Sequence, residues 1–265
     1  MAGLFQVLYG AEDGTFRKAE ALKGTDGEPL VIPHDKQTWT GAICTRPFAV
    51  DWDGDGNLDL VVGNFDGTFY LFRGEGKGAF QPEAEQMKAG KELLKIDGHH
   101  GDPFVIDWDG DGDLDLLSGS SNGGVQWAEN IAGAGEPPEL RPFKTLIKPG
   151  RDVPYGEPLN EDDLTGPTTS TRVWAADVNG DGKLDLLIGD SVTLVSPAKD
   201  LTAKEFKKKF DDWQKAVSEA SQKLSSETNN DKRTKAQKEF QEVYNQRNEF
   251  MKEDQTGFVW LYVRK

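Results

Sequence analysis

The stretch Asp51–Leu60 reads DWDGDGNLDL, and it returns as DWDGDGDLDL at Asp107–Leu116 and as DVNGDGKLDL at Asp177–Leu186. Each copy alternates side chains that carry oxygen with residues that let the backbone turn. Glycine occupies the fourth and sixth positions of every copy, where the left-handed backbone of a tight loop disfavours other residues. Asp and Gly also favour ordinary surface turns, but three copies in one register indicate a repeated loop with a common role.

Such a loop suits a hard cation, because Ca²⁺ takes about six to eight oxygen ligands. Positions 1, 3, 5 and 9 offer side-chain oxygens, whereas position 7 offers its backbone carbonyl and its side chain is therefore free to vary. Asn179, at position 3 of the third copy, keeps an oxygen but drops a charge, so we expect that site to be the weakest. About three calcium ions are predicted. Their predicted ligands are Asp51, Asp53, Asp55, Asn57 and Asp59 in the first loop, Asp107, Asp109, Asp111, Asp113 and Asp115 in the second, and Asp177, Asn179, Asp181, Lys183 and Asp185 in the third.

The residues that follow each loop argue against an EF-hand. That motif needs a glutamate at position 12 and flanking helices, but position 12 is Val62, Ser118 or Ile188. These residues belong to the runs LDLVVG, LDLLSG and LDLLIG. Short apolar runs closed by glycine are typical of buried strands. We therefore predict that each loop joins two strands of a hairpin.

Composition narrows the possible partners and compartments. The 265 residues carry a net charge of −15, which disfavours electrostatic binding to nucleic acid or to an anionic membrane. No apolar stretch approaches the roughly 20 residues that span a bilayer, so no membrane insertion is expected. No signal peptide is visible in MAGLFQVLYG. Cys44 is the single cysteine, which excludes a disulfide framework within the chain, and we expect it to be a small core residue.

More than the loop repeats, and the larger unit predicts an all-β fold. Each loop follows a short strand that carries an aromatic residue at the same place, namely Phe48, Phe104 or Trp174. After the loop come a strand, a turn, a third strand, a further turn and a fourth strand. Four antiparallel strands per repeat are typical of a β-propeller blade. Within such a blade, Trp52 and Trp108 are expected to pack between the sheets.

The two ends of the chain fit the same pattern. The N-terminal segment aligns with the second half of the first unit, and this alignment matches Gly10 to Gly74 and Phe16 to Phe80. The segment 255–265 matches a third strand. The chain therefore predicts about three and a quarter blades, a partial propeller whose first half-blade precedes Met1. Open blade edges favour self-association.

An α-helical hairpin interrupts the last unit at residues 200–254. Thr202 and Glu205 form a capping-box pattern. An apolar stripe then begins at Phe206 and recurs every three or four residues, which predicts an amphipathic helix. A second stripe from Ala236 to Met251 predicts a second helix that folds back on the first. The predicted organisation is thus blades over 1–199, the hairpin over 200–254 and a closing strand over 255–265.

Two further segments contain residues outside the repeat pattern. His99 and His100 form the one histidine pair, and without an obvious third ligand they are better interpreted as part of a loop than as a metal or acid–base site. The segment from Ala132 to Pro167 is rich in Pro, Gly, Glu and Asp, and it is expected to be partly a long loop.

The three loops and the strands around them resemble the FG-GAP/VCBS-type repeats, the blades of integrin α-subunit propellers and of many bacterial secreted and surface proteins. The resemblance implies a β-propeller with Ca²⁺ in its inter-strand loops and a location that is extracellular, at the cell surface or periplasmic. It implies adhesion or ligand binding more often than catalysis. The chain departs from the pattern by its few blades and by its helical hairpin.

These observations lead to three hypotheses. The first is a calcium-stabilised, non-enzymatic propeller segment that binds a protein or a carbohydrate. The second is the propeller domain of a polysaccharide-active lyase or hydrolase, with chemistry near His99, His100, Arg46 or Arg172. The third is a scaffold that docks through the helical hairpin. Calcium-dependent melting, a polysaccharide screen and deletion of the hairpin discriminate among them.

Overall fold

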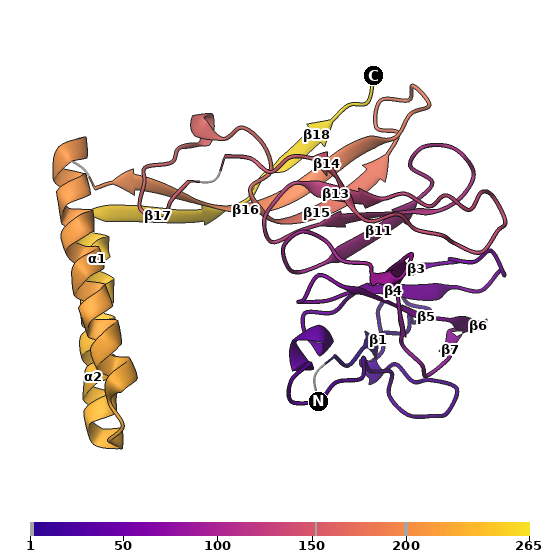
Figure 1. The fold of residues 1–265 in the computed structure, drawn as a ribbon, viewed down its shortest axis with the longest axis horizontal. Coiled ribbons are helices and arrows are strands. Elements are labelled where there is room, and N and C mark those ends of the chain that lie inside the picture. Colours follow the sequence, from indigo (N-terminus) through magenta and orange to yellow (C-terminus); the bar gives the residue numbers. More distant parts are fainter. Residues whose placement is uncertain (1–2, 152, 199–200) are drawn as a thin grey trace. The chain divides into compact units, whose positions relative to one another are not determined.

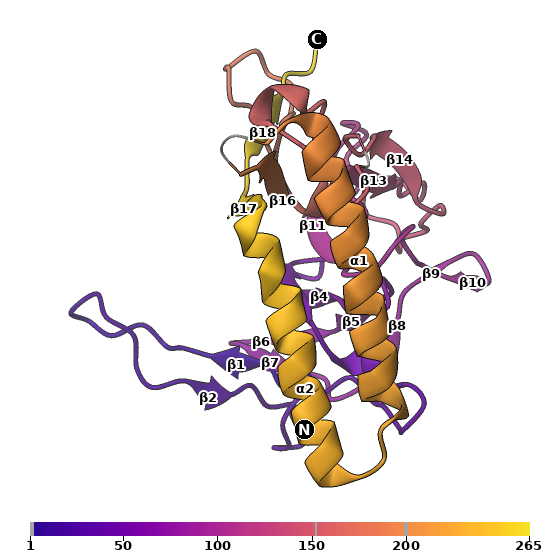
Figure 2. The same cartoon turned by 90° about the vertical axis from the view of Figure 1, so that its left-hand side faces the viewer.

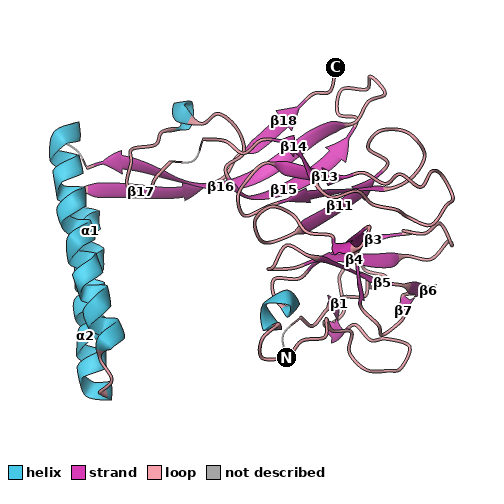
Figure 3. Cartoon of the chain, in the orientation of Figure 1, coloured by secondary structure: helices cyan, strands magenta, loops and turns pink. Residues whose placement is uncertain are grey.

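The chain forms two compact units in the computed structural model. One unit is built mainly from strands, whereas the other carries the helices α1 and α2 (Figures 1 and 3). The first unit comprises Met1–Gly150, Gly166–Ser191 and Gly257–Lys265, and the second comprises Arg151–Thr165 and Val192–Thr256. The residues described are 3–151, 153–198 and 201–265.

Two four-stranded antiparallel sheets form most of the first unit, with the strand orders β3-β4-β5-β8 and β11-β12-β13-β14. The first sheet consists of β3 (Arg46–Val50), β4 (Asp59–Gly63), β5 (Phe69–Phe72) and β8 (Glu85–Gln86). The second sheet consists of β11 (Asp102–Ile106), β12 (Asp115–Gly119), β13 (Val125–Ala128) and β14 (Lys144–Ile147). This is the order predicted for one repeat unit. The strand β14 lies within the segment that we expected to be partly a long loop.

A third sheet contains β15 (Thr169–Ala176), the first half of β16 (Asp185–Pro197) and β18 (Val259–Tyr262). Its register places Trp174 beside Leu187 and Leu187 beside Leu261. The last segment of the chain thus pairs as a third strand, as its sequence predicted.

The N-terminal segment forms a smaller ribbon, in which β1 (Gln6–Val7) pairs with β2 (Glu20–Ala21). Its bridge between Gly10 and Phe16 repeats the pair Gly74 and Phe80, which confirms the predicted alignment. The other short elements of this unit are η1 (Trp39–Ala42), β6 (Gly74–Gly76), β7 (Ala79–Phe80), β9 (Lys88–Ala89) and β10 (Glu92–Leu93).

The three sheets of the first unit stack, because β11 contacts both β3 and β15. Val61 and Leu116 belong to the apolar core between the first and second sheets, and Leu117 and Ile188 belong to the core between the second and third. The aromatic residue of each first strand links the layers, since the ring centroid of Phe104 lies 5.2 Å from that of Phe48 and 5.0 Å from that of Trp174.

Two expectations about single core residues have opposite outcomes. Trp52 and Trp108 are buried in the cores between the sheets, as predicted. Cys44, which we expected to be a small core residue, is exposed. It lies in a bend just before β3, with a positive φ of 53°.

The second unit contains a β-ribbon and a helical hairpin. The second half of β16 pairs with β17 (Met251–Thr256), and α1 (Ala203–Ser226) lies beside α2 (Asn230–Asn245), as Figure 2 shows. The capping box of Thr202 and Glu205 forms as predicted. The shorter elements are η2 (Glu161–Asp163) and η3 (Gln246–Glu249).

The second helix is shorter than its apolar pattern predicted. It ends at Asn245, so Phe250 and Met251 lie outside it, and Met251 begins β17. Both side chains are nevertheless buried in the same aromatic core as Phe206 and Trp213. The periodic pattern therefore identified the core residues correctly but placed the end of the helix too late.

Candidate metal-binding loops

Each acidic loop joins the first and second strands of its sheet, as predicted. The first lies between β3 and β4, the second between β11 and β12, and the third between β15 and β16. The glycines at positions 4 and 6 adopt left-handed backbone conformations in all three loops; in the first, φ is 74° at Gly54 and 88° at Gly56. These turns curl the backbone so that side chains from alternate positions converge.

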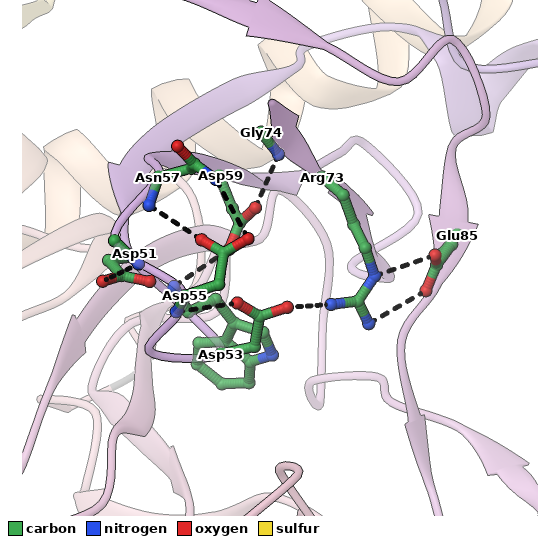
Figure 4. Close-up of polar contacts among 10 residues, drawn as sticks. Asp51, Asp53, Asp55, Asn57, Asp59, Arg73, Gly74 and Glu85 are labelled. Atoms are coloured by element: carbon green, nitrogen blue, oxygen red, sulfur yellow. Dashed lines mark hydrogen bonds and ion pairs between the residues drawn. The ribbon is translucent and has the colours of Figure 1, made fainter. Parts of the chain in front are cut away.

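The first loop gathers three carboxylates (Figure 4). Oxygen atoms of Asp51, Asp53 and Asp59 lie within 4.8 Å of one another. Asp51 accepts a hydrogen bond from the Gly56 amide through Oδ2 at 3.0 Å, whereas its Oδ1 is buried and has no hydrogen-bond partner. A buried, unpartnered carboxylate oxygen is costly unless a cation or water contacts it.

Positions 5 and 7 of the loop interact with each other. Asp55 accepts hydrogen bonds from the backbone and the side-chain nitrogen of Asn57, at 2.7 and 3.1 Å. The corresponding carboxylates Asp111 and Asp181 accept from the backbone amide of position 7 at 3.1 and 2.9 Å. That position 5 and the carbonyl of position 7 ligate a cation stays a prediction.

The second loop repeats the cluster with Asp107, Asp109 and Asp115, again within 4.8 Å. Asp113, at position 7, is buried and accepts a hydrogen bond from the Gly133 amide at 2.7 Å. Its other oxygen is buried without a partner. The side chain at position 7 is thus enclosed in this loop by the segment around Gly133, a contact that the variability of this position did not predict.

The third loop has Asn179 at position 3, so it does not repeat the triplet of carboxylates. Among the residues that the structure describes, only the first two loops bring three acidic side chains within 4.8 Å. Asp177 accepts hydrogen bonds from the Gly180 and Gly182 amides at 2.7 and 2.9 Å, as Asp107 does from Gly110 and Gly112 in the second loop. Asn179 donates its amide to Asp181 at 3.1 Å. The loop keeps its shape through these internal bonds.

Position 9 has a structural role that the sequence pattern did not reveal. Asp59, Asp115 and Asp185 are almost fully buried, and both oxygens of each carboxylate accept backbone N–H groups. One donor is always position 2 of the same loop, as Trp108 shows at 3.0 Å. The other donor follows the third strand and comes from Gly74, Asn130 or Arg264, at 2.7, 2.8 and 2.9 Å. The carboxylate thus links the loop to the third strand of its sheet.

Burial governs the electrostatics of these carboxylates. It raises the pKa of Asp115 to about 6, although the amides of Asn130 and Trp108 favour the charged form. Burial also raises the pKa of Asp59 and of Asp109, and at Asp109 the nearby charge of Asp111 adds to the effect. A cation beside these groups would offset the cost of keeping them ionised.

The two clusters differ in their charged surroundings. Arg73 forms ion pairs with Asp53 and, at 3.0 Å, with Glu85, so a guanidinium group borders the first cluster (Figure 4). The corresponding position of the second unit is Glu129, which pairs with Lys144 at 2.8 Å and with Arg141 at 3.3 Å. The first cluster is therefore partly neutralised by the protein itself.

The donor set of the first two loops fits calcium. It consists of carboxylate oxygens, the ligands that this hard cation prefers. The unpartnered buried Oδ1 of Asp51 points to a missing positive partner. The residues that would hold the ion are Asp51, Asp53 and Asp59 in the first loop and Asp107, Asp109 and Asp115 in the second.

The histidine pair and the two arginines lie near one carboxylate. Asp102 lies 3.7 Å from the Arg46 guanidinium and 3.2 Å from that of Arg172. Arg46 donates to the His100 carbonyl at 3.0 Å, and burial lowers the pKa of His100, with the Arg46 charge as a further cause. Arg46 and Asp102 begin β3 and β11, and Arg172 lies within β15, so the three residues belong to the first strands of the three sheets. Their ion pairs thus join neighbouring sheets.

Comparison with known families supports the repeat interpretation. A model of the FG-GAP-like repeat matches residues 51–118 and 107–188, which together span just over half of the chain. The chain therefore belongs to the FG-GAP-like repeat family. Searches of curated proteins and of solved structures gave no match. Among the residues that the structure describes, no helix is long and apolar enough to cross a membrane.

Proposed function

We propose that the protein is a calcium-stabilised β-propeller-type module that binds a protein or carbohydrate ligand and has no catalytic activity of its own. The convergence of three carboxylates around the unpartnered Oδ1 of Asp51 carries the calcium part of this proposal. Calcium would supply positive charge between carboxylates that otherwise repel one another. The chain's own residues supply the rest, because the glycine turns aim alternate side chains inward.

The calcium role that we propose is structural. Each loop joins the first two strands of a sheet and, through position 9, the end of the third strand. Binding to the folded loop alone would stabilise the fold by mass action, by about 2.7 kcal/mol for one site when calcium is in 100-fold excess over its dissociation constant. The first two loops are the proposed principal sites, and the third is the weakest.

Thermal unfolding tests this role. The midpoint is expected to rise by several degrees when excess Ca²⁺ replaces EDTA. A variant with Asp53→Asn and Asp109→Asn should lose most of that rise, whereas one with Glu83→Gln and Glu92→Gln, an equal charge change at two exposed residues outside the loops, should keep it. An identical midpoint in EDTA and calcium would contradict the proposal.

The binding role rests on family membership and on the charges around Asp102. That carboxylate is paired with two guanidinium groups, which suits a link between sheets better than a general acid or base. We further propose that the module works outside the cytoplasm, in keeping with its repeats. Its net charge of −15 disfavours nucleic acid as the ligand.

A polysaccharide screen separates binding from catalysis. Immobilised acidic and neutral polysaccharides are incubated with the protein in calcium, and bound protein and released sugar are measured in the same samples. Retention without release is the expected result for a carbohydrate-binding module. Release by the native protein that His99→Ala and His100→Ala abolish would identify an enzyme instead.

A further inference from the structure

The first unit contains two junctions between stacked sheets, and both are built in the same way. Each junction has an outgoing half, on the earlier sheet, and an incoming half, on the first strand of the next sheet. In the outgoing half of the first two sheets, the glycine that ends the second strand meets the incoming backbone directly. A Cβ atom on Gly63 would lie 2.2 Å from the Gly101 carbonyl oxygen, and one on Gly119 would lie 2.0 Å from that of Thr171.

The third sheet has the same outgoing half, but there no further sheet of the described chain packs against it. Gly189 occupies the position of Gly63 and Gly119, yet a Cβ atom there would meet nothing within 4 Å. Trp174, which corresponds to the buried Phe104, is 59% exposed. Val259 and Leu261 are 71% and 51% exposed. Their counterparts Phe69, Val125 and Leu71 are almost fully buried beneath the next sheet, and Trp127, the counterpart of Leu261 in the second sheet, is half-buried.

One incoming half, on the first strand of the first sheet, is also exposed. At the two complete junctions, its alternate residues are buried, namely Gly101, Pro103 and Val105 in one and Thr171, Val173 and Ala175 in the other. Their counterparts before and within β3 are half-buried Thr45, exposed Pro47 and exposed Ala49. The N-terminal segment covers Leu60, Val62 and Phe72 on the second and third strands of this face, so the exposed part is its first strand. A cavity of about 410 Å³ opens beside Pro47 and Leu60.

One chain therefore presents both complementary halves of a junction that it builds twice internally. We propose that a second copy of this chain docks head to tail, so that Trp174 and Gly189 on the outgoing face of one copy meet the exposed incoming strand of Thr45, Pro47 and Ala49 in the next. This proposal is independent of the calcium proposal. The docking extends an interface already present within the chain and covers exposed apolar residues.

Backbone contacts specify the register of this docking. At the two internal junctions, Gly101 donates its amide to the Asn64 carbonyl at 2.9 Å, and Thr171 donates to that of Ser120 at 3.0 Å. The corresponding pair between copies is Thr45 with Asp190. Heterologous contacts of this kind close into rings or continue as open chains. The expected species therefore includes assemblies larger than a dimer.

Two variants block one half each without disturbing the folded chain. Gly189→Val places a branched side chain in open space within a strand, a position that the folded monomer tolerates. The same side chain would obstruct the backbone carbonyl of a docking copy. Ala49→Glu places a charge on the exposed incoming face. The matched control is Leu93→Glu, which introduces a charge at another exposed apolar residue.

The test measures molecular mass by sedimentation velocity and light scattering in calcium, over a wide range of protein concentration. The native chain and the control variant are expected to associate as concentration rises, and each blocking variant alone is expected to stay monomeric. Mixing the two blocking variants should restore association but only to a dimer, because one intact half remains on each. Unfolding midpoints measured at low concentration check that both variants fold.

Three outcomes would overturn the proposal. A native chain that is monomeric at every concentration would show that another occupant, or solvent, covers the face. Association that survives Gly189→Val would place the interface elsewhere. If Gly189→Val abolishes association while Ala49→Glu leaves it intact, then two outgoing faces meet each other, and the arrangement is not head to tail.

Discussion

At the scale of single residues, the aspartate at position 9 shows how one side chain acquires two roles. The oxygen-rich pattern predicts it as a metal ligand, and in the first two loops it does lie in the carboxylate cluster. Yet its two oxygens also accept backbone N–H groups from the loop and from the end of the third strand. The pattern of the loop alone does not predict the second donor, because that donor lies 15 residues away from Asp115.

We predict that Asp115→Asn destabilises the fold even without calcium. The amide oxygen of asparagine still accepts one backbone N–H, but its NH₂ group faces the other buried donor and leaves it unsatisfied. Losing a hydrogen bond to a charged group in a buried site costs about 2–3 kcal/mol. Urea unfolding in EDTA measures this loss. Asp109→Asn, at an exposed position, should lower the free energy of unfolding only when calcium is present. Equal losses of stability for both variants in EDTA would contradict this role of Asp115.

A second prediction concerns Arg73, whose guanidinium contacts Asp53 in the first cluster. Arg73→Gln removes a positive charge that competes with a bound cation. Because the pair is partly exposed, its electrostatic effect is about 0.2–1 kcal/mol, which corresponds to a calcium affinity up to roughly fivefold higher. Calorimetric titration measures it. Lys144→Gln, beside the second unit's Glu129, is the matched substitution, and it should leave the affinity of the first site unchanged.

At the scale of elements, the helical hairpin shows what periodicity can and cannot predict. The spacing of Phe206, Phe210 and Trp213 correctly predicts one buried face of α1, and the capping box fixes its start. The ribbon of β16 and β17 was not predicted, because a charged run such as MKEDQT lacks the alternation of a half-buried strand. Its strand pairing comes from the long partner β16, a tertiary contact.

Gly156 provides the test at this scale. It has a left-handed φ of 87°, and a Cβ atom there would lie 1.8 Å from Cζ of Phe210. Gly156→Ala should therefore combine backbone strain with a clash and destabilise the second unit by about 2–4 kcal/mol. Hydrogen exchange of the α1 amides should accelerate, and Phe210→Leu in the same chain should recover part of the loss. Unchanged exchange would show that the segment around Gly156 does not support the helix.

At the scale of the whole molecule, the repeat predicted most of the architecture. Strand order within each four-stranded sheet, the place of the loops and the packing of Trp52 and Trp108 all follow from one pattern read three times. The exposure of Cys44, the burial of Asp113 and the donors of position 9 do not follow from it. Each of these depends on a neighbouring segment that the local pattern does not contain.

The equivalent glycines at the ends of the second strands make the stacking of sheets testable through stability. Gly119→Ala would place a methyl group 2.0 Å from the Thr171 carbonyl oxygen, so the second and third sheets must separate. We expect a loss of about 3 kcal/mol or more. Gly189→Ala meets open space in the corresponding strand position, and there alanine should stabilise the monomer by about 0.5–1 kcal/mol, since it restricts the unfolded chain. Urea unfolding of both variants at low protein concentration measures the contrast, and similar free energies of unfolding for the two would mean that sheet stacking does not hold the first unit together.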